Sequence, residues 1–275
     1  KRGFNTYLFV FLDKNTIFDL RMKTLLSFLI LSFTFSFAQA QLVYKPLTIN
    51  KSDEFSLKNH LYHFEDLTGQ VDIIKAIQLQ KQGKFKESFS STARQDFGYN
   101  KSFHWLFFEL TAANEASLML EIEYANIDHV ELYEVKQNGQ IRSLGLSGDR
   151  FKYAQRPFIN NNYVFPIKLK ARDKAGYFLL LDQPNAILSF FIRLWNRATF
   201  LQTDKEEYFV WGGFIGGICI IWVINLVMLL ITKDLIYFWY SVYGHCMTMH
   251  LFSDAGLGFQ YLWPNAPVIN QYDPV

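Results

Sequence analysis

The residues of this sequence that are best suited to binding chemistry gather in one segment between two strand-like runs. Asp149 and Arg150 follow a glycine in the sequence SGDR. Arg156, six residues after Arg150, directly precedes a proline. Carboxylate and guanidinium groups form hydrogen bonds with hydroxyl-rich ligands, and aromatic faces such as those of Trp105 and Tyr133 can stack on sugar rings. We predict that these five residues contact a ligand or shape the loop that holds it.

Each of these residues also has a plain structural interpretation. Gly148 followed by Asp149 is ordinary turn chemistry, although loops between strands are also where sandwiches place their binding sites. Trp105 fits a hydrophobic core as well as it fits a ligand platform. The sequence leaves both interpretations open.

The sequence contains no GxSxG, HExxH, CxxC or P-loop motif. Acidic residues such as Glu121 and Glu123 could flank a glycosidic bond, but they alternate with apolar residues, which is typical of the solvated face of a strand. Cys246, His250 and Asp254 share a helix face and could bind a transition metal, yet polar residues of a helix bundle usually face each other or water. We expect no enzyme activity, metal or cofactor here; an anchored glycan hydrolase is the less favoured alternative.

The elements that must position these residues are mostly strands. Apolar or alternating runs of seven to nine residues are separated by turn sequences such as KQNGQ and DQPN; they cover 103–111, 117–125, 129–135, 162–170, 175–183 and 188–195. Short turns between such runs predict an antiparallel β-sandwich, with a barrel as the alternative. A short helix is expected near 71–81, because apolar residues recur there at helical spacing and Gly83 follows.

Composition limits the partners of the chain. It has 27 Lys+Arg against 25 Asp+Glu, so the concentrated basic charge that nucleic acid requires is missing. The 28 Phe, 15 Tyr and 6 Trp suit strands and membrane interfaces. The two cysteines both lie in the apolar C-terminal part, so no disulfide framework is expected in the region before it.

The N-terminal part resembles an export signal that does not start at residue 1. Residues 22–40 combine Lys23, an apolar run and the small-residue site Ala38-Gln39-Ala40, as a signal peptide does. We interpret residues 1–21 as upstream read-through; a genuine extension that turns the signal into an anchor is the alternative. Residues 41–205 would then form an exported sensor domain.

The C-terminal part, 206–275, is predicted to hold two membrane helices and the loop that follows them. Residues 210–231 carry no charge and would extend about 33 Å as a helix, enough for a hydrocarbon core of about 30 Å. A second apolar segment, 235–252, begins directly after Lys233 and Asp234. Export of the preceding region would place Lys233 in the cytoplasm, in line with the positive-inside rule.

Small residues in the first of these helices predict packing against other helices. Gly212 and Gly216, and likewise Gly213 and Gly217, are four residues apart and share a face. Asn225 in the same helix requires an internal partner in a membrane. These five residues favour a helix bundle over a lone anchor.

The order of the motifs resembles one family. A tryptophan opens the strand HWLFFEL, Asn114 follows, and then come IDHVELYEV, GD-x5-RP from Gly148 to Pro157, and a strand near VFPIKL. This order is similar to the type 2 extracellular domain of bacterial seven-transmembrane receptors with diverse intracellular signalling modules (7TMR-DISM). HFEDLTGQVDIIKAIQ and GKFKESF are similar to the opening of that domain, and KDLIYFWYSVYG with GLGFQYLWP to the start of the seven-helix region.

The resemblance covers roughly residues 58–265 and implies more than the residues alone. It implies a jelly-roll sandwich like carbohydrate-binding modules, placed in the periplasm, and then seven helices in the inner membrane. A cytoplasmic kinase, cyclase or phosphatase domain would follow. The expected partners are a small soluble or carbohydrate ligand and the membrane, and a homodimer stays open. The alternative is a membrane-anchored binding or adhesion module that transmits no signal.

Overall fold

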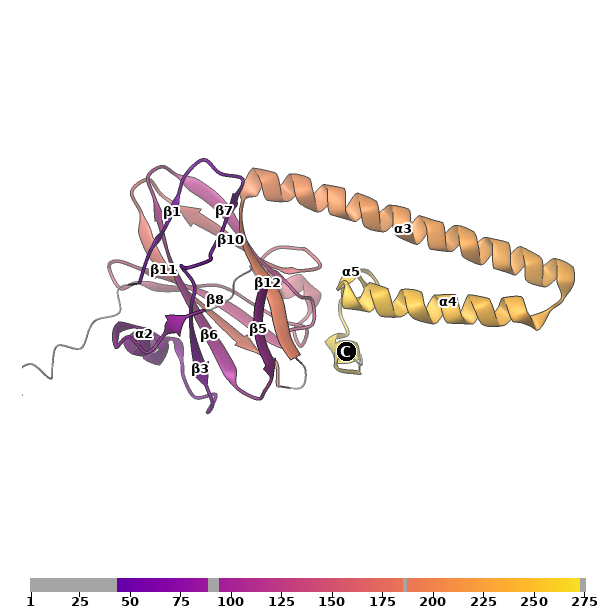
Figure 1. The fold of residues 1–275 in the computed structure, drawn as a ribbon, viewed down its shortest axis with the longest axis horizontal. Helices are drawn as coiled ribbons and strands as arrows, with labels where there is room; N and C mark the ends of the chain where they lie inside the picture. Colours follow the sequence, from indigo (N-terminus) through magenta and orange to yellow (C-terminus); the bar gives the residue numbers. More distant parts are fainter. Residues whose placement is uncertain (1–43, 89–93, 185–186, 273–275) are drawn as a thin grey trace, which may run out of the picture. The chain divides into compact units, whose positions relative to one another are not determined.

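Two β-sheets form most of the molecule in the computed structural model, which describes residues 44–88, 94–184 and 187–272 (Figure 1). The seven-stranded sheet has the order β4-β3-β6-β11-β8-β9, with β1 pairing parallel to β6. Its strands are β1 (Leu47–Ile49), β3 (Tyr62–Asp66), β4 (Lys86–Glu87), β6 (Phe103–Ala112), β8 (His129–Lys136), β9 (Ile141–Ser147) and β11 (Lys174–Asp182).

The five-stranded sheet has the order β10-β7-β12-β2, and β5 also pairs with β12. Its strands are β2 (Glu54–Phe55), β5 (Arg94–Tyr99), β7 (Ala116–Glu123), β10 (Tyr163–Leu169) and β12 (Ile187–Asn196). Apolar side chains from both sheets form one core, which includes Phe108, Leu120, Phe165 and Leu179. The predicted β-sandwich is therefore confirmed, and the barrel alternative is not adopted.

A second apolar layer covers the outer face of the seven-stranded sheet. Helix α2 (Ile73–Lys81) begins at Asp72, whose carboxylate accepts a hydrogen bond from the Lys75 amide at 2.8 Å. Beneath it, Trp105, Phe107 and Phe178 form a cluster separate from the inner core. Because β6 has apolar neighbours on both faces, its sequence reads as a nearly continuous apolar run instead of an alternating one.

Helix α3 (Arg197–Thr232) starts directly after β12, with no linker between them. The Asn196 side chain accepts a hydrogen bond from the Ala198 amide at 3.0 Å and so caps the helix. Phe200, in the first turn, packs with Met119 and Val164 on the outer face of the five-stranded sheet. The helix is thus both covalently joined to the sandwich and packed on it.

The sequence placed the first membrane helix at 210–231, but α3 begins 13 residues earlier, at Arg197. Polar side chains between 197 and 207 hid this part of the helix from a search for apolar runs. Among the described residues, α3 is the one helix that is long and apolar enough to cross a membrane by length and composition. Helix α4 (Leu235–Asp254) packs along α3 after a turn at Lys233 and Asp234, as predicted.

The chain after α4 forms the short helix α5 (Leu257–Tyr261) and the 3₁₀ helix η2 (Pro267–Tyr272).

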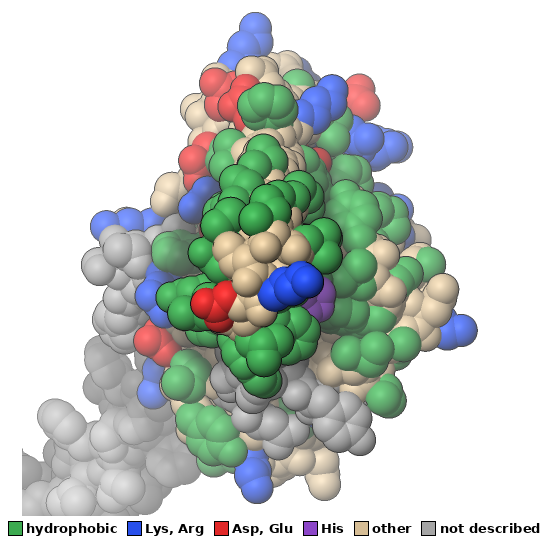
Figure 2. Space-filling view, turned by 90° about the vertical axis from the view of Figure 1, so that its right-hand side faces the viewer, with side chains coloured by type: hydrophobic (Ala, Val, Ile, Leu, Met, Phe, Trp, Pro, Cys, Tyr) green, Lys and Arg blue, Asp and Glu red, His purple; other side chains and the backbone are tan. Residues whose placement is uncertain are grey.

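Figure 2, viewed from the side of the α3–α4 hairpin, shows hydrophobic side chains gathered over this hairpin. They include Ile220, Ile224, Leu230, Trp239 and Tyr243, each more than half exposed. Exposed side chains of this kind are expected where a helix faces lipid or other helices.

Candidate functional site

The structure separates the five predicted ligand residues into two groups. Trp105 and Tyr133 lie on β6 and β8, in the cluster that includes the residues of α2. Asp149, Arg150 and Arg156 lie in the segment between β9 and β10, around the 3₁₀ helix η1 (Tyr153–Gln155). A single small ligand is therefore not surrounded by all five.

Trp105 is a core residue. Only 1% of its surface is exposed, and its ring stacks on that of Tyr133, with centroids 6.2 Å apart. The structural interpretation that the sequence left open fits this position. Tyr133 is half-buried at the edge of the same cluster.

The Gly148-Asp149 turn is fixed against the segment that precedes β8. Gly148 has φ +144°, and an added Cβ would collide with the backbone of Asp128. The Asp149 amide donates a hydrogen bond to the Ile127 carbonyl at 2.8 Å. The glycine is thus required by close backbone approach, which is a structural reason for the GD motif.

Two carboxylates lie together at this turn. Arg150 forms an ion pair with Asp128, whereas Asp149 is buried with 5% of its surface exposed. Burial, and next the charge of Asp128, raise the pKa of Asp149 to about 7, although Arg150 and Arg156 act in the opposite direction. Asp149 therefore changes its charge near neutral pH.

Arg156 is held entirely by groups of the protein. Its surface is 6% exposed, and its Nη1 donates to the carbonyls of Asn160, Asn161 and Asn162 at 2.6, 2.8 and 3.2 Å. Its guanidinium also lies over aromatic rings on several sides: those of Tyr153, Tyr163 and Phe259, at 4.6, 4.5 and 5.6 Å from their centroids. Phe259 belongs to α5, so this side chain joins the sandwich to the chain that follows the α3–α4 hairpin.

We call the contact between residues 148–163 and residues 255–270 the junction. It contains three hydrogen bonds in addition to the Arg156–Phe259 contact: from Asn161 Nδ2 to the Ala255 carbonyl, from the Tyr153 amide to the Pro264 carbonyl, and from Asn270 Nδ2 to the Asp149 carbonyl, at 3.0, 3.1 and 3.0 Å. The segment that the sequence identified as a ligand loop is therefore docked on the residues that follow α4.

Gly256 shows how close this approach is. It caps α5 with φ +70°, and an added Cβ would lie 2.6 Å from Ala125 Cβ and 2.7 Å from the Asn161 carbonyl oxygen. Both of those residues belong to the sandwich. Any larger side chain would push α5 away from it.

The predicted helix-packing residues do not contact α4. A Cβ added at Gly212, Gly213, Gly216 or Gly217 would meet no atom within 4 Å of the described chain. Asn225 Nδ2 donates to the Ile221 carbonyl of its own helix at 2.9 Å. Packing against further helices stays a prediction for these residues.

The contact between α3 and α4 uses other residues. A Cβ on Gly244 would lie 3.3 Å from Trp222 Nε1, and the rings of Trp222 and His245 are 5.0 Å apart. On α4, His250 and Asp254 form a pair at 3.7 Å, but within the described ranges no group of three side chains is arranged to hold a metal ion.

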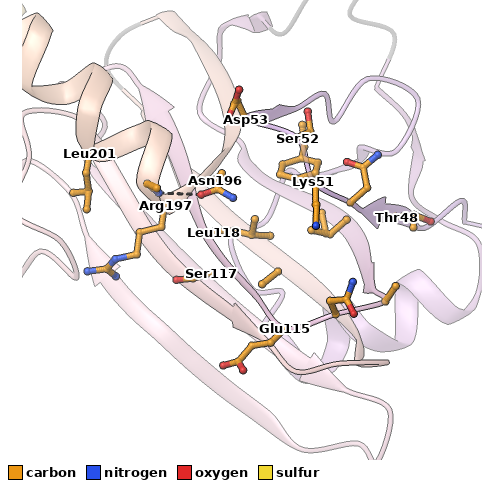
Figure 3. Close-up of a pocket in the computed structure, with 17 residues that line it drawn as sticks. Thr48, Lys51, Ser52, Asp53, Glu115, Ser117, Leu118, Asn196, Arg197 and Leu201 are labelled. Atoms are coloured by element: carbon orange, nitrogen blue, oxygen red, sulfur yellow. Dashed lines mark hydrogen bonds between the residues drawn. The ribbon is translucent and has the colours of Figure 1, made fainter.

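A pocket of about 1000 Å³ lies at the start of α3 (Figure 3). It is lined by residues 48–53, from the end of β1 to the loop before β2, by residues 113–118, from the β6–β7 turn into β7, and by residues 196–198, together with Phe55 and Leu201. Nothing in the sequence analysis identified it, because its polar residues are spread over three short segments without a motif. Asn114 was noted only as one position of the family resemblance.

Family models match two parts of the chain. The model described as 7TMR-DISM extracellular 2 matches residues 58–196, and the model described as 7TM diverse intracellular signalling matches residues 207–274. The two regions coincide with the sandwich and with the α3–η2 segment. The fold and its docked helices thus define the sensor and membrane part of a transmembrane receptor, and the chain belongs to the 7TMR-DISM family.

Solved structures resemble the sandwich at a low level. One is TmCBM61 in complex with β-1,4-galactotriose, with 10% identity over 54% of this chain and 100% of that chain and a TM-score of 0.29. Another is CBM32-3 from a family 31 glycoside hydrolase of Clostridium perfringens, with 10% identity over 40% of this chain and 80% of that chain and a TM-score of 0.25. A third is the K3 adhesin domain of Lys-gingipain from Porphyromonas gingivalis (16%, 38% and 69%, TM-score 0.23). No curated protein matches the chain by sequence.

Proposed function

We propose that the sandwich binds a small soluble ligand in the periplasm and transmits this binding through the helices of the inner membrane to a cytoplasmic output domain of the complete receptor. The observation that carries the proposal is the junction. The sandwich is attached to the membrane part by its covalent continuation into α3 and also by its contact with residues 255–270. Two attachments allow a change in the sandwich to alter the position of one end of α4 relative to α3.

The docked junction contains buried polar atoms that lower its stability. Four buried polar atoms there have no hydrogen-bond partner in the described part of the protein: Asp149 Oδ1, Tyr153 Oη, Arg156 Nε and Arg156 Nη2. A buried polar atom without a partner costs about 1–3 kcal/mol. The docked arrangement is therefore less favourable than its number of contacts indicates, and a ligand that binds one arrangement more tightly can shift the equilibrium.

In this proposal Asp149, Arg150 and Arg156 transmit a signal and do not contact the ligand. The side chain of Arg150 is occupied by Asp128, that of Arg156 by backbone carbonyls and aromatic rings, and that of Asp149 is buried. A carbohydrate remains one candidate ligand, and its binding site is not defined by these residues. A homodimer is compatible with this arrangement but is not required by it.

The test is the output activity of the complete receptor in nanodiscs, measured as phosphoryl transfer or cyclic-nucleotide synthesis according to the output domain. Arg156→Met keeps the volume in the aromatic cage but removes the hydrogen bonds to the three carbonyls. We expect basal output to change severalfold, while Lys168→Ala on the exposed side of β10 leaves it unchanged. Unchanged output in Arg156→Met would contradict signal transmission through the junction.

A further inference from the structure

The pocket at the start of α3 has the size and lining of a ligand site. Its volume of about 1000 Å³ lies at the upper end of the usual range for small-molecule pockets. Its lining includes the apolar side chains of Ala116, Ala198 and Leu201, which keep exposed surface and lie beside the buried Ile49 and Leu118. Polar and charged side chains make up the rest of the lining.

The rim of this pocket carries equal numbers of positive and negative side chains, and most of them form no ion pair with the described residues. Lys51 and Arg197 are cationic, and Asp53 and Glu115 are anionic. Lys51, Arg197 and Glu115 form no ion pair with any residue that the structure describes. Figure 3 shows Lys51 extending downward from its loop, Arg197 directed to the left away from Lys51, and Glu115 below them.

This lining fits a ligand that carries both signs of charge. A carboxylate can pair with Lys51 or Arg197, and an ammonium group can pair with Glu115. The amides of Asn50 and Asn114 match peptide groups, which both donate and accept hydrogen bonds. Phe55 is the one aromatic residue of the lining and is only 6% exposed, so the pocket offers no exposed ring on which a sugar could stack.

We propose that this pocket binds a short peptide with free termini and small or aliphatic side chains, of about two to four residues given the pocket size. The inference rests on the proposed function, because it assigns the ligand of the same sensor. The termini would pair with the rim charges, and the side chains would lie against Ala116, Ala198 and Leu201.

A ligand in this pocket would act directly on α3. The Asp53 carboxylate accepts a hydrogen bond from Thr199 Oγ1 at 2.8 Å, and the Asp53 carbonyl accepts one from the Asn196 amide at 2.8 Å. The loop 48–53 is therefore attached to the first turn of the membrane helix. Movement of this loop around a peptide would reach α3 without passing through the sandwich core.

The experiment measures thermal unfolding of the complete receptor in nanodiscs at increasing probe concentration. The first probe is an equimolar mixture of tripeptides of Ala, Leu, Ser and Gly with free termini. The matched probe is the same mixture with acetylated N-termini and amidated C-termini, and the third probe is maltotriose. We expect only the first to raise the unfolding midpoint, because binding to the folded state stabilises it.

Two variants connect the effect to the pocket. In the double variant Lys51→Gln/Glu115→Gln, the half-saturating concentration of the free peptides should rise about tenfold. Lys81→Gln, an exposed lysine of α2 outside the pocket, should leave it unchanged.

Several results would overturn the inference: no shift with free peptides, an equal shift with blocked peptides, or an unchanged response in the double variant. A shift with maltotriose that the double variant removes would replace the peptide by a neutral sugar at the same pocket. None of these results would contradict the role of the junction, which is tested by the output of Arg156→Met. Failure of the peptide inference and failure of the proposed function are therefore distinguishable.

Discussion

The junction and the pocket at α3 are two places where the sandwich meets the membrane part, and they differ in how their charges are used. At the junction, Arg156 and Asp149 are 6% and 5% exposed and their surroundings belong to the protein. At the pocket, Lys51, Arg197 and Glu115 border an open volume without an ion-pair partner in the described chain. Both places connect to a helix, one through α5 and the other through the first turn of α3.

This difference shows that a charged loop with aromatic neighbours is not by itself a binding site. Arg, Asp and Tyr are suited to ligand contact because they form directional hydrogen bonds, and the same property makes them suited to holding two parts of one chain together. Burial distinguishes the two uses. A buried and hydrogen-bonded arginine is a structural link, whereas an exposed and unpaired one is free for a ligand.

The largest expected effect in this comparison is that of Arg156→Ala. It removes the donor to three buried carbonyls and empties the space between three rings. We expect the free energy of unfolding to fall by about 3 kcal/mol, measured by urea denaturation in detergent micelles. Lys168→Ala is the matched control and should change it by less than about 0.5 kcal/mol; a similar small change for both would contradict the structural role of Arg156.

A smaller loss is expected for Tyr163→Phe. The buried Tyr163 hydroxyl lies 2.6 Å from the Ala125 carbonyl and 2.9 Å from the Ile127 carbonyl, and its single proton serves both. Removing it leaves these buried acceptors without this donor, at a cost of about 1–2 kcal/mol in the same measurement. Tyr99→Phe, at a ring that is 65% exposed, should be neutral; equal effects of the two substitutions would show that the hydroxyl is not structural.

The stability of the junction should also depend on pH through Asp149. Its pKa of about 7 in the folded chain lies above the ordinary value of 3.8, because of burial and then the charge of Asp128. The folded state therefore binds the proton more tightly, so this contribution is complete below about pH 4 and is lost as the pH rises through 7. The loss should be at most about 1.4 kcal/mol per pH unit.

The measurement is the difference in unfolding free energy between the wild type and Asp149→Asn from pH 5 to 8. The contributions of other groups cancel in this difference. One of these groups is His63: burial lowers its pKa to about 4, so its contribution changes in the opposite direction between about pH 4 and 6.5. Groups that interact with Asp149 do not cancel fully; these are Asp128, Arg150 and Arg156. A difference that stays constant over this range would show that Asp149 does not titrate there.

The smallest effect is expected at the pocket. Lys51→Gln and Glu115→Gln alter exposed side chains without an ion-pair partner among the described residues, so each should change the free energy of unfolding by less than about 0.5 kcal/mol. The measurement is urea denaturation without added peptide. A loss above 1 kcal/mol would mean that these charges stabilise the fold, and the contrast with the junction would then disappear.

The sequence predicted those strands and helices whose burial produces a recognisable pattern of apolar residues. The six long strand-like runs and the helix near 71–81 appear as β6, β7, β8, β10, β11, β12 and α2. It missed the short or exposed strands β1–β5 and β9. Ile141 and Arg142 of β9, for example, are exposed at a sheet edge, so that strand lacks the alternation of apolar residues on which the prediction relied.

The site was harder to predict than the fold. Asp149 and Arg156 were predicted to contact a ligand or shape its loop, but the structure places them against Asn270 and Phe259, which lie more than 100 residues later. No local pattern connects such positions. The pocket residues 48–53 and 113–118 have ordinary loop sequences, and only the fold brings them together with the start of α3.

The central claim is that the junction holds the sandwich on the membrane part. Amide hydrogen exchange of α5, Leu257–Tyr261, measures this contact directly in the complete receptor in nanodiscs. We predict that Arg156→Ala lowers the protection of α5 more than that of β6 and β11, whose protection falls only by the loss of global stability. Unchanged protection of α5 in that variant would contradict the claim.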